Sequence, residues 1–267
     1  SRSAKMLTLL SPAKKLKAEA PTAALEVTRP RLAEDTRELA KVAKEQSAAD
    51  LSRLMHISDK LAELNAERFT AFDLDGRSNS AAPAGLTFDG DVYWGLEATS
   101  LADETLAYAQ DHLRILSGLY GVLRPMDAIQ PYRLEMGTKM ANTRGTSLYD
   151  FWGSRIGEQL SQDLSGHSDQ TVVNLASNEY FKAVDAAALP GRVIEASFLN
   201  VKDGEARRLM YHVKFARGLM ARWIMENRIE KADDLRGFDA EGYRFDASAS
   251  TDTELVFTRP QPPVKKK

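Results

Sequence analysis

The sequence of 267 residues contains no cysteine. This absence excludes disulfides, thiolate zinc sites, cysteine-ligated iron–sulfur clusters and cysteine nucleophiles at once. Histidine is also scarce, and the four histidines are scattered with no pair at the spacing typical of metal ligands. The sequence therefore predicts no metal site and no bound cofactor. A carboxylate-only iron site stays open, although no residue pattern points to it.

Long hydrophobic runs are missing as well. No apolar stretch approaches the roughly 20 residues that a membrane-spanning helix needs. No charged-then-apolar signal segment stands at the N-terminus either. We therefore expect a cytoplasmic protein with no membrane partner.

The chain also lacks an internal repeat or a linker that would divide it. Its length allows one large domain or two modest ones, and its 43% hydrophobic and 28% charged residues are typical of a globular protein. We predict a single domain over residues 6–258 with Met6 as the natural start. Residues 1–5 and 259–267 are predicted to be disordered or added tails.

An excess of charge of either sign is absent too. The 36 basic and 38 acidic residues give a formal net charge of −2. This balance excludes a protein coated in positive charge, but it allows a basic cleft on a neutral body. The glycine patterns of nucleotide-binding loops are also missing, because Gly118 and Gly121 have neither a third glycine nor a following Lys-Ser/Thr pair.

Residues 112–138 are the most distinctive stretch that is present. Leu113 and Leu116 lie three apart and predict an amphipathic helix, which ends at a turn containing Gly118 and Gly121. This spacing of apolar residues and glycines is typical of a helix-hairpin-helix element, in which backbone N–H groups hold a phosphate. Gly-x-x-Gly between helices is more often an ordinary turn, so the local sequence leaves both interpretations open.

Two predicted strands are each followed by polar or basic residues. Met6–Leu10 precedes Ser11 and Lys14, and Thr171–Leu175 precedes the polar segment 176–182. Ligands gather at the C-terminal ends of strands in sheets that helices cover. For the first strand, a ligand site and a plain strand end with solvated lysines are equally compatible with the sequence.

Most of the remaining chain is predicted to be helical, with a hairpin over 193–213 and a final strand at Leu255–Phe257. A turn and a short buried strand are expected over 88–96, where Asp91 is either a functional carboxylate or a turn cap. The helix predicted over Lys214–Asn227 carries cations in its N-terminal half. Cations there oppose the helix dipole, which suggests that an anionic partner holds them. The predicted helices cover 31–44, 50–56, 58–69, 101–116, 148–164 and 214–227.

Nucleic-acid binding fits these features best. The glycine hairpin offers main-chain donors, several cations supply charge, and tyrosines lie among them to stack on bases or to pack. No pattern for reading base edges stands out, so we expect binding through backbone and shape. The cations are Arg114, Arg124, Arg133, Lys182, Lys214, Arg217 and Arg222, and the tyrosines are Tyr120, Tyr132 and Tyr180.

Several stretches together resemble one family closely. The chain is similar, in the same order from Met6 to Phe257, to the YaaA family of bacterial peroxide-stress proteins. Lys15 is a small departure, because relatives tend to have threonine there. The matching stretches are Ser11-Pro12-Ala13-Lys14, 57–62, 90–93, 112–137, 174–177, 179–182 and 216–222.

The resemblance implies a mixed α/β fold: a single compact domain with a central, largely buried sheet, surrounding helices and a helix-hairpin-helix element. It also implies that the protein binds double-stranded DNA in a positively charged cleft, without strong sequence specificity, and limits oxidative damage associated with free iron. We expect a monomer. The residues predicted to bind DNA are Lys14, Lys60, Arg114, Gly118, Tyr120, Gly121, Arg124, Arg133, Lys182, Lys214, Arg217 and Arg222.

Two other functions remain as alternatives. The chain would be an enzyme if polar groups at the strand ends converged on one small nucleotide-like or anionic substrate, and the sequence leaves the question of catalysis open. It would be an iron-sequestering protein if carboxylates formed a metal site, which the poor ligand inventory disfavours. The residues of the enzyme alternative are Ser11, Lys14, Asp91, Glu179 and Lys182.

Overall fold

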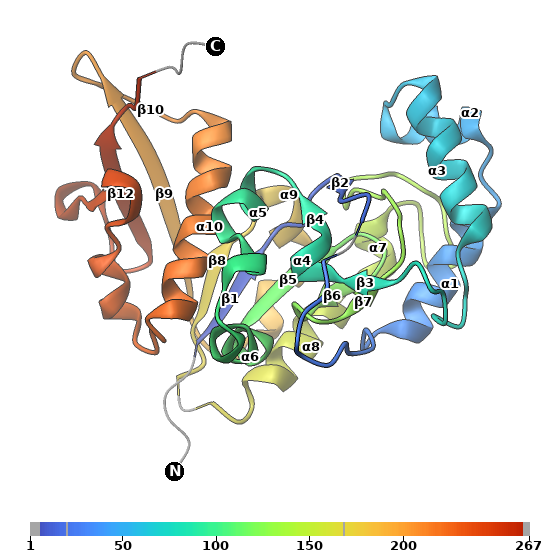
Figure 1. The fold of residues 1–267 in the computed structure, drawn as a ribbon, viewed down its shortest axis with the longest axis horizontal. Coiled ribbons are helices and arrows are strands. Elements are labelled where there is room, and N and C mark those ends of the chain that lie inside the picture. Colours follow the sequence, from blue (N-terminus) through green and yellow to red (C-terminus); the bar gives the residue numbers. More distant parts are fainter. Residues whose placement is uncertain (1–5, 20, 168, 264–267) are drawn as a thin grey trace.

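The largest element of the fold is an eight-stranded sheet in the order β11-β12-β9-β8-β1-β5-β6, with β10 paired to the end of β9 (Figure 1). The computed structural model describes residues 6–19, 21–167 and 169–263. From β12 to β5 the neighbouring strands are parallel, whereas β6, β10 and β11 pair antiparallel. The strands are β1 (Leu7–Leu10), β5 (Leu113–Ser117), β6 (Gly121–Leu123), β8 (Val172–Leu175), β9 (Val193–Lys202), β10 (Glu205–Arg207), β11 (Arg244–Phe245) and β12 (Glu254–Pro260).

The middle of this sheet is covered on both faces. Every residue of β1, β5 and β8 is buried, as expected for parallel strands between layers of helices, which have near-continuous apolar sequences. The strands predicted at 6–10 and 171–175 are thus confirmed, as is the mixed α/β class with a central sheet and surrounding helices.

The order of the strands places a topological reversal beside β1. Strand β5 pairs with one edge of β1, and β8 pairs with the other. The chain therefore builds the sheet outward on one side first and then returns to the opposite side of β1. Ligands of open α/β sheets bind outside the C-terminal ends of the strands at such a reversal. The residues directly after β1 and β8 mark that position here.

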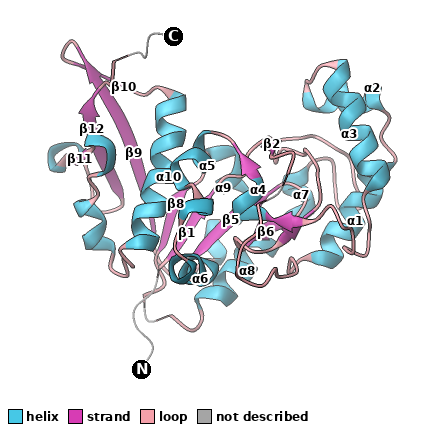
Figure 2. Cartoon of the chain, in the orientation of Figure 1, coloured by secondary structure: helices cyan, strands magenta, loops and turns pink. Residues whose placement is uncertain are grey.

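Ten α-helices and several short elements surround the sheet in the described ranges. Figure 2 shows α1, α2 and α3 gathered at one end of the molecule, away from the large sheet. The α-helices are α1 (Ala33–Lys44), α2 (Ala48–Met55), α3 (Asp59–Ala71), α4 (Ala84–Thr87), α5 (Asp91–Leu96), α6 (Asp103–His112), α7 (Leu148–Trp152), α8 (Arg155–Leu164), α9 (Asn178–Phe181) and α10 (Met210–Glu226). The 3₁₀ helices are η1 (Ala98–Ser100), η2 (Lys182–Val184), η3 (Ala186–Ala188), η4 (Ala232–Gly237), η5 (Ala240–Gly242) and η6 (Ala247–Ala249), and the two small sheets pair β2 (Lys15–Leu16) with β4 (Phe88–Asp89) and β3 (Ala82–Pro83) with β7 (Ala128–Ile129).

Helices α5 and α10 touch backbone to backbone. A Cβ atom added to Gly218 would lie 1.8 Å from the carbonyl oxygen of Val92, and one added to Gly95 would lie 2.2 Å from that of Phe215. Only glycine allows this approach. The contact fixes α10 against α5 and so sets the position of the cations on α10.

The predicted helix-hairpin-helix at 112–138 is not what the structure contains. Residues 113–117 form a strand, and Gly121 at φ +74° begins the antiparallel partner, so the glycine turn closes a β-hairpin. Gly118 is required by packing, because a Cβ atom there would lie 2.2 Å from the carbonyl oxygen of Leu134. A short buried strand has no period that separates it from a buried helix, which explains the error.

Two other local predictions need correction. Residues Asp91–Leu96 form helix α5, where the sequence predicts a strand. Strand β12 continues through Arg259 and Pro260, so these two residues belong to the sheet and not to the predicted tail. Arg259 is buried there and donates from Nε to Asn200 Oδ1 at 2.7 Å. The predicted tail residues 1–5 and 264–267 lie outside the described residues.

Candidate functional site

A pocket of about 340 Å³ lies at the topological reversal, where β1 and β8 end. Ser11 follows β1 and Ser177 follows β8, and the two are joined by hydrogen bonds. The N–H of Ser177 donates to Ser11 Oγ at 2.8 Å, and Ser11 Oγ donates to Ser177 Oγ at 3.4 Å. Tyr93 secures the same place by donating from its hydroxyl to the carbonyl of Ser11 at 2.7 Å. We call this cavity the strand-end pocket; its lining is Ser11, Pro12, Ala13, Lys14, Lys15, Asp89, Gly90, Asp91, Val92, Glu135, Ser177, Glu179, Tyr180, Lys214 and Arg217.

Helix α10 supplies two cations to the strand-end pocket, Lys214 and Arg217, which are one turn apart. Lys214 is exposed, whereas Arg217 is only 9% exposed. Burial lowers the pKa of the Arg217 guanidinium, and the nearby charge of Arg208 lowers that pKa further. A buried cation costs free energy unless an anion accompanies it.

Three of the four carboxylates around the pocket already have partners. Glu135 Oε1 lies 3.4 Å from Lys14 Nζ and accepts from Arg133 Nη2 at 3.2 Å. Glu179 accepts from a backbone N–H at 2.9 Å, and Asp89 accepts from the Trp94 indole at 2.9 Å. These contacts leave the carboxylates less free to neutralise the cations on α10.

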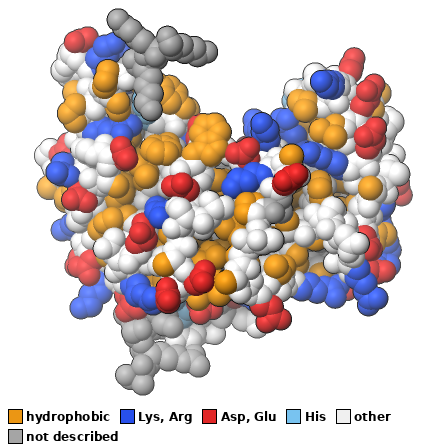
Figure 3. Space-filling model, viewed as in Figure 1, with side chains coloured by type: hydrophobic (Ala, Val, Ile, Leu, Met, Phe, Trp, Pro, Cys, Tyr) orange, Lys and Arg blue, Asp and Glu red, His pale blue; other side chains and the backbone are white. Residues whose placement is uncertain are grey.

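A second hollow of about 500 Å³ adjoins the strand-end pocket, and we call it the α2 hollow. Glu135 and Glu179 line both cavities, which therefore lie side by side, and we call the two cavities together the groove between α10 and the end of α2. Figure 3 shows the molecule deeply hollowed between these two sides, with several Lys and Arg side chains along the hollow. The α2 hollow is lined by Arg53, Leu54, Met55, His56, Glu135, Gly137, Thr138, Lys139 and Glu179.

Cations outnumber carboxylates in the groove. Six Lys or Arg residues line it, against four Asp or Glu residues. This local excess differs from the whole chain, whose net charge is −2. The cations are Lys14, Lys15, Arg53, Lys139, Lys214 and Arg217.

The turn between α2 and α3 stands at the far end of the groove. His56 ends α2 in the left-handed conformation at φ +54°, and Ser58 caps α3 by accepting from the N–H of Leu61. Lys60 is exposed in the first turn of α3. The Ser-Asp sequence that predicts this cap is a usual start of a helix.

The structure brings some of the predicted DNA-binding residues together. Lys14, Lys214 and Arg217 line the strand-end pocket, and Lys60 follows His56, which lines the α2 hollow, by four residues. The Lys182 Nζ atom lies 5.2 Å from the ring centre of Tyr149, whose hydroxyl donates to the carbonyl of Glu179. Lys182 is exposed and next to the groove, although it does not line the strand-end pocket.

Four predicted DNA-binding residues are instead buried in the fold. Arg114 is 5% exposed, and its Nε donates to Asp163 at 2.9 Å. Gly118 and Gly121 are buried, so neither backbone is open to a phosphate, and a Cβ atom at either position would collide with packed atoms. Tyr120 is 4% exposed and cannot stack on bases.

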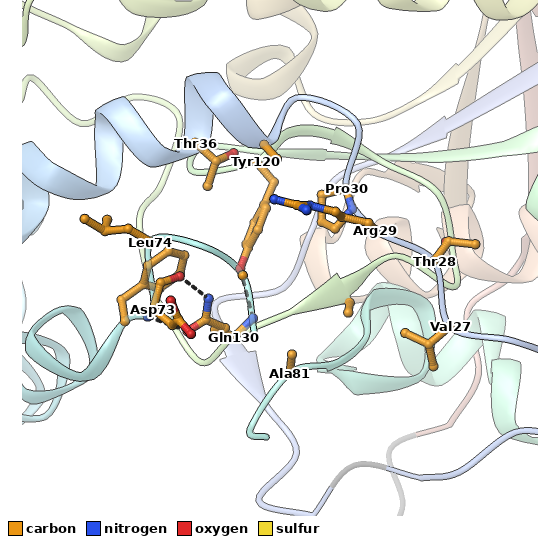
Figure 4. Close-up of a pocket in the computed structure, with 14 residues that line it drawn as sticks. Val27, Thr28, Arg29, Pro30, Thr36, Asp73, Leu74, Ala81, Tyr120 and Gln130 are labelled. Atoms are coloured by element: carbon orange, nitrogen blue, oxygen red, sulfur yellow. Dashed lines mark hydrogen bonds between the residues drawn. The ribbon is translucent and has the colours of Figure 1, made fainter. Parts of the chain in front are cut away.

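Figure 4 shows how Tyr120 is held in the wall of a separate cavity of about 250 Å³. Its hydroxyl accepts from the N–H of Gln130 at 2.9 Å, while the Gln130 side chain bonds the backbone of Asp73. Burial raises the pKa of the Tyr120 hydroxyl well above its usual range. The side chain therefore has a structural role.

Three more predicted cations bind other protein groups. Arg124 pairs with Asp127, and Arg133 pairs with Glu135. Arg222 donates from Nη1 to the carbonyls of Leu96 and Glu97 at the end of α5. A cation at a helix C-terminus satisfies orphan carbonyls and complements the helix dipole. The sequence cannot show this capping role, because the two carbonyls are more than 120 residues away from Arg222.

The residues of the enzyme alternative also largely converge. Ser11, Lys14, Asp91 and Glu179 line the strand-end pocket, and Lys182 lies outside that lining. Sequence reasoning missed Asp89, Arg53 and Lys139 as groove residues. Each of the three lies close in sequence to a predicted element. The sequence does not show that the 135–139 segment packs near α2, and this packing is what brings Arg53 and Lys139 into one cavity.

A metal cluster and a membrane-spanning helix are both absent from the part of the chain that the structure describes. Over residues 6–19, 21–167 and 169–263, no three His, Asp or Glu side chains come together in a way that would hold a metal ion. In the same ranges no helix has the length and apolar character to cross a membrane.

Comparison with known proteins places the chain in a family. The family described as peroxide stress protein YaaA matches residues 6–249. The chain belongs to this family. The UPF0246 protein of Phenylobacterium zucineum is 55% identical over 258 residues, which are 97% of this chain and 96% of the relative. UPF0246 proteins of Caulobacter vibrioides and Saccharophagus degradans are 54% and 50% identical over 96% of this chain and 100% of each relative.

Proposed function

We propose that this protein binds double-stranded DNA in the groove between α10 and α2, without strong sequence specificity, as its part in the response to peroxide stress. Membership in the YaaA family supports the role in peroxide stress. The observation that carries the DNA proposal is that the strand-end pocket and the α2 hollow adjoin each other and that cations line both. On this proposal, the limitation of iron-associated damage follows from DNA binding.

The two ends of the groove offer different contacts to a phosphate backbone. The α10 end presents Lys214 as an exposed point charge. The α2 end presents Lys60 on the first turn of α3, where the helix dipole and free N–H groups also favour an anion. Contacts of this kind position a duplex but do not read its bases.

This function is tested by reversing the charge of Lys139, which lines the α2 hollow, and of Lys60 and Lys182, which follow the lining residues His56 and Tyr180 within four positions of the chain. The triple variant Lys60→Glu, Lys139→Glu and Lys182→Glu removes exposed cations and leaves the strand-end pocket intact. Fluorescence anisotropy with a labelled duplex of about 25 base pairs at 100 mM salt should show an affinity reduced by at least about tenfold, because fewer neutralised phosphates release fewer counterions.

A matched control separates the effect of the groove cations on DNA affinity from the effect of the protein's net charge. The triple variant Lys41→Glu, Arg77→Glu and Lys231→Glu changes net charge by the same amount at exposed residues that do not line the groove. It should reduce affinity much less than the groove variant does. Equal reductions in the two folded variants, or undetectable duplex binding by the unaltered protein, would contradict the proposal.

A further inference from the structure

Arg217 is a largely buried residue whose guanidinium forms no ion pair within the described ranges. Its side chain is 9% exposed, and over the residues that the structure describes it makes neither a hydrogen bond nor an ion pair. The carboxylate nearest in electrostatic effect is Glu195, which accepts from Asn174 Nδ2 at 3.3 Å instead. Arg217 lines the strand-end pocket, and none of its nitrogens is among the fully enclosed polar atoms that have no hydrogen-bond partner, so solvent reaches the guanidinium of this largely buried side chain. A guanidinium that lines a pocket and has no ion-pair partner is suited to bind an anionic ligand.

The surroundings of Arg217 add positive charge. Arg208 lowers the pKa of Arg217, and Lys214 lies one turn away on α10 without an ion-pair partner among the described residues. Within the described ranges, Asp91 is the one pocket carboxylate whose oxygens accept no hydrogen bond, whereas Asp89, Glu135 and Glu179 each accept one. The lining of the strand-end pocket holds four cations and four carboxylates, yet Lys214 and Arg217 form no ion pair within the described ranges, so both are available to an anionic ligand.

We propose that the strand-end pocket binds a phosphate monoester, with Arg217 as its bidentate anchor and Lys214 as a second contact. A guanidinium matches two phosphate oxygens at once, and a dianion balances two cations better than a carboxylate does. The volume of about 340 Å³ exceeds what a phosphate group alone requires, and Pro12, Ala13 and Val92 offer apolar surface to the rest of the ligand. A nucleoside 5′-monophosphate has this combination of groups.

Such a site goes beyond DNA binding, because the pocket would hold a phosphate monoester with or without a duplex in the groove. Two ligands carry such a phosphate monoester: a free mononucleotide, and a DNA strand that ends in a 5′-phosphate. Position at the topological reversal of the sheet agrees with either source, since this is the usual place for ligands in such folds.

The first experiment measures binding of defined probes to the full chain. Thymidine 5′-monophosphate should raise the Tm and give a saturable isotherm by titration calorimetry, whereas thymidine and sodium chloride at equal ionic strength should not. Inorganic phosphate should bind more weakly than the nucleotide. If the nucleotide raises the Tm no more than thymidine or salt does, the proposal is overturned.

Variants then assign the anchor. Arg217→Gln should weaken nucleotide binding by at least about tenfold. The nucleotide affinity of Arg217→Lys should lie between those of Arg217→Gln and the unaltered protein, because lysine keeps the positive charge but lacks the two parallel N–H groups of the guanidinium. The ligand-free Arg217→Gln protein should melt at the same or a higher temperature, since it loses an unpaired buried charge. A purely structural arginine would give a lower Tm with nucleotide binding unchanged, and this result would overturn the proposal.

A surface variant keeps the test decisive if Arg217→Gln fails to fold. Lys214→Gln alters an exposed side chain and should weaken nucleotide binding about threefold, because one of two phosphate contacts is removed. Lys231→Gln, at an exposed residue outside the pocket lining, should have no effect. Equal nucleotide affinities in these two variants would overturn the assignment of the site.

Duplexes with and without a 5′-phosphate separate the two sources. A preference for the phosphorylated end that is abolished by Arg217→Gln assigns the strand terminus. Equal affinities for the two duplexes, alongside nucleotide binding, assign the free nucleotide.

Failure of this inference and failure of the proposed function are distinguishable. Loss of duplex binding in the groove triple variant with unchanged nucleotide affinity would separate the two sites. Duplex binding without any nucleotide effect would leave the groove proposal standing and remove the pocket proposal.

Discussion

At the scale of single residues, the best-defined charge cluster joins Asp163 to two arginines. Asp163 accepts from Arg31 at 2.5 and 2.8 Å and from Arg114 at 2.9 Å. The Asp163 and Arg114 side chains are each 6% exposed. Asp163→Asn should lower the free energy of unfolding by about 3–5 kcal/mol, because it leaves a buried guanidinium without its counter-charge. Urea denaturation measures this, and the exposed Asp252→Asn should change it by less than about 0.5 kcal/mol.

The same cluster sets a dependence on pH. Burial opposes ionisation of Asp163, but hydrogen bonds and charge from Arg31 and Arg114 outweigh it and hold the pKa of that carboxyl below its usual range. A depressed folded-state pKa contributes stability above the unfolded value of about 3.9, and this contribution is lost as pH falls through the folded pKa. The Tm difference between the unaltered protein and Asp163→Asn should therefore be constant from about pH 6 to 5 and shrink below about pH 4. A difference that stays constant down to about pH 3 would contradict this assignment.

Residue type alone cannot separate structural cations from those of the groove. Arg114 and Lys214 both follow apolar residues in predicted elements, yet Arg114 pairs with a carboxylate 49 residues away and Lys214 pairs with none in the described chain. Whether a cation forms an ion pair within the fold depends on residues that are distant in the sequence. That Lys14, Lys214 and Arg217 lie together could be predicted in part, because a strand end and a helix face are local features, and the structure places all three in the lining of one pocket.

At the scale of elements, the crossing of α5 and α10 controls the position of Arg217. Gly218 lies against Val92 with no room for a Cβ atom. Gly218→Ala should force the helices apart and lower the free energy of unfolding by about 1–3 kcal/mol. Gly237→Ala is a matched control, because its added Cβ would meet nothing closer than 3.8 Å. Urea denaturation with similar destabilisation in both variants would contradict the packing argument.

Correct predictions concern elements with a clear periodic or apolar signature. In the helix over Ala33–Lys44 the buried residues recur at helical spacing and lie on one face. The strand Val172–Leu175 is a short apolar run between residues typical of turns. The errors fall where that signature is ambiguous. Leu113–Ser117 has helical spacing but lies in the sheet, and the six-residue helix Asp91–Leu96 is too short and too buried to show a period.

At the scale of the whole molecule, the groove depends on the order of strands, which the sequence does not reveal. The strand ends at Leu10 and Leu175 are each predictable from a local apolar run. Only the pairing of β8 with β1 places Ser11 and Ser177 in contact. The segment 135–139 and the end of α2 then extend the pocket into a groove, by packing between parts of the chain that share no local pattern.

Duplex binding should depend on salt concentration, because the affinity has to come from the cations of the groove and not from the net charge of the protein. Because the protein carries a formal net charge of −2, its overall field does not attract DNA, and any affinity for a duplex must come from the local excess of cations in the groove. If about four to six phosphates are neutralised, log K should fall with log salt at a slope of about −3.5 to −5.5, so that raising salt from about 50 to 200 mM weakens binding by about 10²–10³-fold. Anisotropy titrations over this range measure the slope. The variant Lys60→Glu, Lys139→Glu and Lys182→Glu should flatten it by about 2 to 3, whereas the control with Lys41→Glu, Arg77→Glu and Lys231→Glu should keep it. A slope near zero in the unaltered protein would mean that phosphate contacts do not provide the affinity, and the groove would then lose its proposed role.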